Sequence, residues 1–424
     1  MTACSLFSSD KNLPKGKRLS VIEAQDDTYA KTNTQSTIKV SEPQDIQGYY
    51  QIGGNEAHHT GNIKVSKNME EAYRASFEHG ASKQNLILAH PVIDNNLLYM
   101  QNVEGTVYAF DLKNGERVFK QKLKSLNKND AESTSNGAGL AAGEGKIYAL
   151  TGFGGVFALD GLNGDVIWRK DLAAPIRSAP TLAKDKLFVL TIDNHLYALK
   201  ADDGSEIWQY SVSSEDTVLA GSASGAYDQK SETYITAFSN GELTAFNARI
   251  GYPVWSVDMA QLSDFGASTG INSLKASPVI DEKTVISVGP TNTSAIDLAN
   301  GDILWRRYIS GTQTPIVDQN AIYLVSDAQT LVALDKNDGT TLWQVDVLEK
   351  LKRKERAEII LRGPILVGGR LMITASNGVI YLFKAQNGTL EAEVNTNEDL
   401  SLAPIAAQKN IVLTTDNAKL LVYK

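Results

Sequence analysis

Ala158-Leu159-Asp160-Gly161-Leu162-Asn163-Gly164-Asp165-Val166-Ile167-Trp168 reads as the end of one strand, a tight turn and a second strand that closes on tryptophan. The Asn-Gly pair favours a hairpin turn, and the apolar residues on both sides favour strands. Four further copies keep the same spacing, with alanine six residues before the glycine and tryptophan four residues after it. These copies centre on Gly204, Gly251, Gly301 and Gly339 and end at Trp208, Trp255, Trp305 and Trp343.

All five tryptophans of the chain occupy this one position. A large apolar ring at a fixed place in each repeat is predicted to pack against the small alanine of its own or a neighbouring repeat. We therefore interpret these tryptophans and the glycines of the turns as structural residues that join one repeat to the next, and not as a ligand site.

Seven repeats have a central glycine, because weaker copies with Phe119 and Ala392 in place of tryptophan surround Gly115 and Gly388. Neighbouring glycines lie 38 to 50 residues apart, which is the period of a β-propeller blade. Each repeat holds four short apolar segments separated by Gly, Asn or Asp turns, which predicts four strands. A unit this small buries both faces only when it stacks radially against its neighbours.

An eighth unit begins at Pro404 and reaches Lys424 without a strand for the tryptophan position. The strand-like run Tyr49–Ile52 is predicted to supply that strand, which would leave the ring without an open edge. The sequence thus predicts an all-β fold, an eight-bladed β-propeller of four-stranded antiparallel blades, closed by pairing an N-terminal strand with the C-terminal blade. A seven-bladed ring is the alternative, if the first repeat is irregular.

The N-terminal residues 1–44 are rich in polar residues and are predicted to form a lipoprotein N-terminus and a flexible tether, with residues 45–424 forming the propeller. Thr2-Ala3-Cys4 fits the ending of a bacterial lipoprotein signal, so Cys4 is a candidate lipidation site. The charged and apolar regions of such a signal are missing, and we interpret the recorded start as lying inside a signal peptide. A chance cysteine near the N-terminus is the alternative.

The composition argues against several classes of protein. The formal charge of −8 and the pI near 5.3 argue against nucleic acid as a partner, because phosphate binding needs a basic surface. The single cysteine allows neither an intrachain disulfide nor a cysteine-based metal cluster. No window approaches the roughly 20 apolar residues that span a membrane.

No set of residues indicates a catalytic or metal site. The aspartates of the repeat come once per blade before the turn, where a carboxylate is expected to accept hydrogen bonds from turn amides rather than bind calcium. His58 and His59 would point to opposite faces of a strand, so we interpret them as loop residues and not as metal ligands. We therefore predict no catalytic residue, no metal and no cofactor.

Four longer connections interrupt the regular repeat, at residues 121–138, 211–226, 256–276 and 344–362. They are predicted to project from one rim of the ring, where loops are free to bind partners. The second and third contain apolar side chains, which would be buried if a partner bound over them. The fourth mixes lysine, arginine and glutamate, and is interpreted as an amphipathic helix with solvated charges or as a patch for an acidic partner.

The phrase Ala-x-Asp-x-x-x-Gly-x-x-x-Trp resembles the tryptophan-docking repeat of the PQQ-type propellers. Within that superfamily the chain resembles the BamB family, lipoprotein subunits of the machine that inserts β-barrel proteins into the bacterial outer membrane. The chain length, the start Cys4-Ser5-Leu6-Phe7 and the single cysteine carry this resemblance. The other branch, the PQQ-dependent dehydrogenases, is typically longer, and many members have a vicinal cysteine pair that this chain cannot form.

The resemblance implies a non-enzymatic scaffold of the BAM complex, tethered through Cys4 to the periplasmic face of the outer membrane as one monomeric subunit. It further implies that inter-blade loops bind a periplasmic POTRA domain of BamA, the barrel-forming subunit, and so assist the folding and insertion of outer-membrane proteins. A Leu-x-Leu-Arg stretch of the family matches Thr217-Val218-Leu219-Ala220, and two family aspartates match Ser273 and Lys275. Val218, Leu219, Ser273 and Lys275 are thus the candidate contact residues, in a contact whose charged part has changed.

Two other functions stay open at this point. One is a PQQ-dependent quinoprotein dehydrogenase. The other is a general peptide-binding periplasmic propeller that holds unfolded outer-membrane protein precursors at its strand edges or in its funnel.

Overall fold

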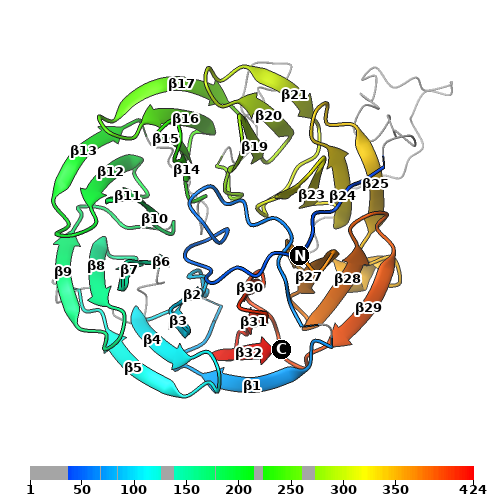
Figure 1. Cartoon of the computed structure of the whole chain (residues 1–424), viewed down its shortest axis with the longest axis horizontal. Coiled ribbons are helices and arrows are strands. Elements are labelled where there is room, and N and C mark those ends of the chain that lie inside the picture. The colour runs from blue at the N-terminus through cyan, green and yellow to red at the C-terminus, as the bar shows by residue number, and fades with distance from the viewer. Residues whose placement is uncertain are drawn as a thin grey trace, which may run out of the picture.

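Eight four-stranded antiparallel sheets stand around a common axis and form a closed ring (Figure 1). The computed structural model describes residues 37–66, 68–83, 85–125, 138–176, 178–213, 223–259 and 273–424. The eight-bladed propeller predicted from the repeats is confirmed, and the seven-bladed alternative is wrong. Blades are numbered here 1 to 8 in the order of their innermost strands along the chain.

The first four blades each run from an inner to an outer strand in chain order. Blade 1 contains β2 (Val92–Asp94), β3 (Leu97–Gln101), β4 (Thr106–Asp111) and β5 (Arg117–Lys122). Blade 2 contains β6 (Gly139–Gly143), β7 (Lys146–Leu150), β8 (Gly155–Asp160) and β9 (Val166–Asp171). Blade 3 contains β10 (Thr181–Ala183), β11 (Lys186–Leu190), β12 (His195–Lys200) and β13 (Glu206–Ser211). Blade 4 contains β14 (Ala226–Asp228), β15 (Thr233–Ala237), β16 (Glu242–Asn247) and β17 (Tyr252–Asp258).

The next three blades repeat this order, and blade 8 completes the ring. Blade 5 contains β18 (Val279–Asp281), β19 (Thr284–Val288), β20 (Thr293–Asp297) and β21 (Ile303–Arg307). Blade 6 contains β22 (Ile316–Asp318), β23 (Ala321–Val325), β24 (Thr330–Asp335) and β25 (Thr341–Asp346). Blade 7 follows the short helix α1 (Arg353–Arg356) and contains β26 (Leu361–Val367), β27 (Arg370–Ala375), β28 (Val379–Lys384) and β29 (Leu390–Asn395). Blade 8 contains β30 (Ile405–Ala407), β31 (Asn410–Thr414), β32 (Lys419–Tyr423) and, outermost, β1 (Glu71–Ser76).

The antiparallel order gives the ring two different faces. Every connection from an outer strand to the next inner strand leaves on one side, which we call the connector face. The turns that carry the repeated glycine lie on the other side, the glycine-turn face. In the turn of blade 2, the Asp160 carboxylate accepts hydrogen bonds from the amides of Leu162 (2.8 Å) and Asn163 (3.1 Å). The chain then passes through Gly164 at φ +80°, a conformation that favours glycine.

Each tryptophan joins its own blade to the next one. Trp168 lies opposite Ala158 in the sheet of blade 2, and its indole N–H donates to the carbonyl of Ala201 in blade 3 at 2.9 Å. A Cβ on Gly204 would come within 2.7 Å of the Trp168 ring, so the turn of blade 3 rests directly on the indole face. Trp208, Trp255, Trp305 and Trp343 make the same pair of contacts with the following blade.

An N-terminal strand closes the ring, as predicted, but it is not Tyr49–Ile52. The strand β1 pairs antiparallel with β32, with Tyr73 opposite Val422. Its sequence, Glu-Ala-Tyr-Arg-Ala-Ser, is largely polar and mostly exposed, because an outermost strand buries little of its surface. The more apolar run at Tyr49–Ile52 lies at the axis instead, where Tyr49 forms an isolated bridge with Ile93 of blade 1.

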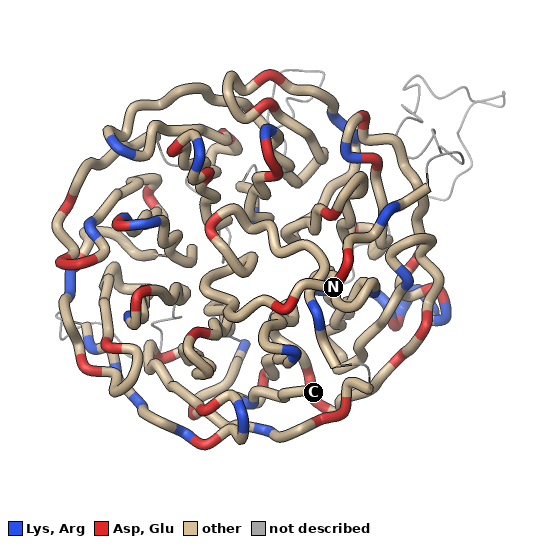
Figure 2. Tube along the Cα trace, in the orientation of Figure 1, with Lys and Arg blue, Asp and Glu red and all other residues tan. Residues whose placement is uncertain are grey.

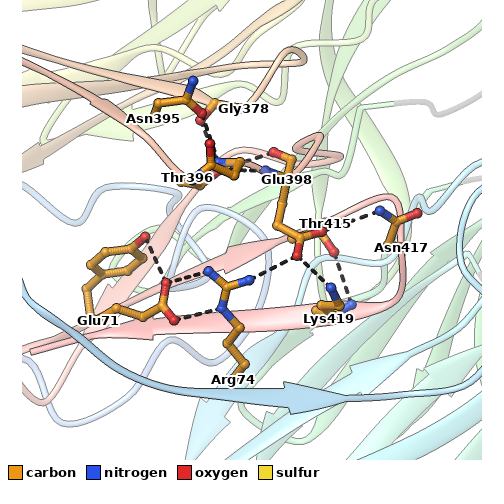
Figure 3. A network of polar contacts seen from close by, with 11 residues as sticks. Glu71, Arg74, Gly378, Asn395, Thr396, Glu398, Thr415, Asn417 and Lys419 are labelled. Carbon is orange, nitrogen blue, oxygen red and sulfur yellow. Dashed lines mark hydrogen bonds and ion pairs between the residues drawn. The ribbon is translucent and has the colours of Figure 1, made fainter.

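Blades 7 and 8 are joined without a tryptophan. Ala392 stands at the tryptophan position of blade 7, and blade 8 has no glycine turn to receive a ring. Figure 3 shows a polar network on this side of the ring. Arg74 of β1 contacts Glu71 (2.7 Å) and Glu398 (2.9 Å), and Glu398 also accepts from Lys419 of β32 at 2.5 Å. The Lys419 ammonium, followed by Asn417 and Arg74, lowers the pKa of Glu398 and keeps it ionised.

Candidate functional site

The four longer connections all belong to the connector face, because each joins an outer strand to the next inner strand. Three of them have middle parts that lie outside the described residues. These parts include Val218 and Leu219, two of the predicted contact residues, and Cys4 also lies outside the described part of the chain.

The fourth connection, between β25 and β26, is described in full. It contains a helix of only four residues, α1, none of which is buried. Arg356 ties the helix to the blade through Asp346 (2.6 Å), and the Gln329 side chain donates to the carbonyls of Arg356 and Ile359. Lys352, Arg353 and Lys354 remain exposed beside these contacts, so this connection presents cations from a well-anchored loop.

The other two predicted contact residues lie at the inner end of the connector face. Ser273 is only 5% exposed, beside Leu274, whose carbonyl accepts from the amide of Ala223 at 3.3 Å. Lys275 is half-buried and lines a cavity on the axis. The structure thus places both residues near the axis and not on the outer rim.

Residues 46–63, which we call the axial plug, fill the centre of the ring (Figure 1). The plug makes hydrogen bonds with all eight blades, in the order of the blades around the ring. In seven blades the partner lies in the first strand, and in blade 8 it is Gln408, directly after β30. Its contacts run from Ile46 with Gln408 (blade 8) through Tyr49 with Ile93, Tyr50 with Ala142, Gln51 with Leu182, Glu56 with Tyr227, Ala57 with Ile280 and His59 with Val317 to Ile63 with Leu366 (blade 7).

Some side chains of the plug form the hydrogen bonds with the backbone of an inner strand that a neighbouring strand would form. Gln51 is 3% exposed, accepts from the Leu182 amide at 2.8 Å and donates to the Leu182 carbonyl at 3.2 Å. His58 is buried, with its Nδ1 2.8 Å from the carbonyl of Pro278. The two adjacent histidines are loop residues held by backbone carbonyls. Within the described ranges, no group of three or more His, Cys, Asp or Glu residues is placed to hold a metal ion.

A cavity of about 360 Å³ lies between the plug and the connector face. The plug forms its floor, and the starts of the inner strands form its walls. Its titratable lining residues are Tyr49, Lys275, His58, His90, Arg362 and Asp416. Burial lowers the pKa of both histidines to about 4, with the Arg362 charge adding to the effect on His90. Burial also lowers the pKa of Arg362, and Asp416 opposes that shift.

The charges on the outside of the ring are mixed. Figure 2 shows lysine and arginine interspersed with aspartate and glutamate along the outer strands and turns. Some of them pair between blades, as Lys146 of blade 2 does with Asp202 of blade 3 at 2.6 Å. In the described part of the chain, no helix is both long and apolar enough to cross a membrane.

Neither the plug nor the cavity was predicted from the sequence. The plug forms hydrogen bonds mainly through its backbone, and every residue type provides backbone groups. The plug also occurs only once, so a search for repeats does not find it. A partial signal is the turn-rich polar run around Gly53-Gly54 and Asn55, which is typical of irregular structure.

Comparison with known proteins gives a consistent picture. A curated relative, the outer membrane protein assembly factor BamB of Yersinia pestis, is 24% identical over 330 residues, covering 76% of this chain and 81% of the relative. The crystal structure of BamB from Moraxella catarrhalis superposes with a TM-score of 0.66 at 16% identity, covering 84% of this chain and 97% of that one. The crystal structure of the quinohemoprotein alcohol dehydrogenase of Comamonas testosteroni matches with a TM-score of 0.69 at 12% identity, covering 89% of this chain and 80% of that one.

The two structural matches show the shared propeller fold and no more, because both identities are low. The family profile described as outer membrane protein assembly factor BamB is more specific, since it matches residues 103–345, which is more than half of the chain. That description names an assembly factor and not an enzyme, in agreement with the predicted absence of catalysis. The chain therefore belongs to the family of the outer membrane protein assembly factor BamB.

Proposed function

We propose that this chain is a scaffold subunit of the BAM complex that assists the folding and insertion of outer-membrane proteins. The observation that carries the proposal is the family match over residues 103–345, together with a relative of the same description along three quarters of the chain. The closed ring supports a scaffold role, because its blades are locked by buried joints while its longer connections leave one face.

The partner we propose is a periplasmic POTRA domain of BamA, bound at the connector face. Two features support this face. All four longer connections belong to it, and its fully described loop offers the exposed cations Lys352, Arg353 and Lys354. Val218 and Leu219 are the proposed apolar contacts. Ser273 and Lys275 lie nearer the axis, so we propose that they act at the inner edge of the same contact.

The proposed location is the periplasmic face of the outer membrane, with Cys4 as the lipid anchor. The first described residues meet the ring on the glycine-turn face, where Thr37 and Lys39 bond to Asn320 in the turn between β22 and β23. A tether attached there leaves the connector face free for a partner.

The experiment is co-purification of BamA with the tagged full-length protein from outer membranes. The double variant Val218→Asp with Leu219→Asp is expected to lose BamA, because two carboxylates would replace the proposed apolar contact. Leu162→Asp is the matched control, since Leu162 is 71% exposed in a turn on the opposite face. Failure of the unaltered protein to retain BamA would refute the proposal, and equal retention by all three proteins would refute the proposed contact.

A further inference from the structure

The described lining of the axial cavity holds two cations, Arg362 and Lys275, and one carboxylate, Asp416. Arg362, at the start of β26, has a buried Nε atom without a hydrogen-bond partner. Among the described residues, neither Arg362 nor Lys275 is in an ion pair, and Asp416 is the only carboxylate on the cavity wall. Asp416 is itself engaged, because it accepts a hydrogen bond from the Ser401 hydroxyl. The cavity therefore carries an excess of positive charge.

His58 adds a hydrogen-bond acceptor to the same cavity. The carbonyl of Pro278 can only accept, so the Nδ1 atom of His58 must carry the hydrogen of their 2.8 Å contact. With its pKa near 4 the ring is neutral at pH 7, which leaves a lone pair on Nε2. This Nε2 is buried and has no partner, on a side chain that is 2% exposed and lines the cavity.

The rest of the wall mixes apolar side chains with the polar side chains of Thr60, Thr312, Gln313, Thr314 and Ser401. Leu86, Ile87, Leu88, Ile360, Ile365 and Leu402 line it. The volume of about 360 Å³ lies within the range of small-ligand sites, which are mostly apolar with a few fixed polar groups.

We propose that this cavity binds a carboxylate carried on an apolar body, with Arg362 holding the carboxylate and the apolar residues of the wall holding the body. A free aliphatic acid and the C-terminus of a peptide with an apolar last residue share this chemistry. The peptide also offers a backbone N–H beside its carboxylate, which matches the unpartnered Nε2 of His58. Binding places a carboxylate against a largely buried cation that is in no ion pair among the described residues, so the ligand stabilises the fold.

The test uses the full-length protein and titration calorimetry, with the thermal midpoint as a second readout. The probes are sodium octanoate against octanamide, and N-acetyl-Ala-Ala-Leu with a free against an amidated C-terminus. We expect saturable binding of at least one free carboxylate, with a raised thermal midpoint, and no comparable binding of its amide. The arm that binds more tightly identifies the source of the carboxylate.

Variants separate charge recognition from apolar filling. Arg362→Gln is expected to weaken binding of the free carboxylate at least about ten-fold, because a hydrogen bond to a charged group is lost. The affinity of Arg362→Lys is expected to lie between those of Arg362→Gln and the unaltered protein. Arg353→Gln is the matched control, on the exposed face of α1. His58→Asn keeps a donor for Pro278 and is expected to weaken only the peptide. If amides bind as well as acids, if neither acid binds at millimolar concentration, or if Arg362→Gln changes nothing, the proposal is wrong.

This inference does not rest on the proposed partnership with BamA. Arg362→Gln is expected to co-purify with BamA as the unaltered protein does, so the two proposals fail independently.

Discussion

The hydroxyl of Tyr73 donates a hydrogen bond to the carbonyl of Leu112 at 2.8 Å, across the point where the ring closes. Its ring lies against Gly115, whose added Cβ would collide with it. Leu112 holds the same place in blade 1 that Ala201 holds in blade 3, where the indole of Trp168 donates. Tyr73 of β1 therefore serves as the missing tryptophan of blade 8, and the closing joint has the same construction as the five joints made by tryptophan.

Loss of Tyr73 is expected to weaken this closing joint. Tyr73→Ala should lower the free energy of unfolding by roughly 2–3 kcal/mol, because a half-buried ring and a hydrogen bond are removed. Tyr73→Phe should lower the free energy of unfolding by about 1 kcal/mol, because only the hydrogen bond is lost. Tyr73→Trp should leave it close to that of the unaltered protein. Urea denaturation measures these values, with Tyr252→Ala as control because Tyr252 is 69% exposed. Equal effects of the two alanine variants would contradict the assigned role.

The contact between Gly204 and Trp168 can be separated from backbone strain. Gly204→Ala places a Cβ 2.7 Å from the indole at φ +70°, so both the contact and the backbone oppose it. Gly145→Ala has φ +75° but meets nothing within 4 Å, so only the backbone strain of roughly 1 kcal/mol applies. We expect Gly204→Ala to be the more destabilising by at least about 1 kcal/mol in thermal unfolding. Identical midpoints would show that the indole contact is not tight.

The axial plug is expected to protect the inner strands from exchange with solvent. Gln51→Ala removes both hydrogen bonds to the backbone of Leu182 and should cost about 1–3 kcal/mol. Hydrogen exchange of the Leu182 amide should accelerate strongly, while Gln344→Ala, an exposed site on β25, should leave it unchanged. Slow exchange at Leu182 in the Gln51 variant would mean that the plug contributes little there.

Burial of His58 makes stability depend on pH. Its pKa in the folded protein is about 4, below the ordinary 6.5, so the folded state resists protonation. The stability from neutral His58 is complete above pH 6.5 and is lost as the pH falls toward 4, because over this window the unfolded chain binds a proton that the fold does not. The loss is on the order of 3 kcal/mol.

The non-titrating variant His58→Asn isolates this contribution from that of His90, whose pKa is also lowered to about 4, and from the carboxylates that titrate in the same window. Denaturation at pH 7.5 and at pH 4.5 should show a smaller drop in the variant than in the unaltered protein. Parallel losses in the two proteins would exclude His58 as the source.

Much of the ring could be predicted from the sequence because the joints between blades need particular residue types. Only a large aromatic side chain such as Trp168 reaches the next blade, and only glycine leaves room for it. The regular spacing of these two residue types therefore indicates the contacts between blades. The closing strand was misassigned for the converse reason, since β1 is exposed and needs no apolar pattern. The plug and Arg362 were missed because backbone hydrogen bonds and a single buried cation leave no periodic trace.

The plug also imposes an order on folding. Residues 46–63 and β1 are the first parts of the ring to be synthesised, yet their partners extend to Gln408 and to β32 near the end of the chain. This segment therefore cannot complete its contacts until the last blade has been synthesised. The N-terminal part of the ring is then the last to form all of its hydrogen bonds. Removing β32 would leave β1 without the strand it pairs with, so the closure of the ring depends on the last strand of the chain as much as on the first.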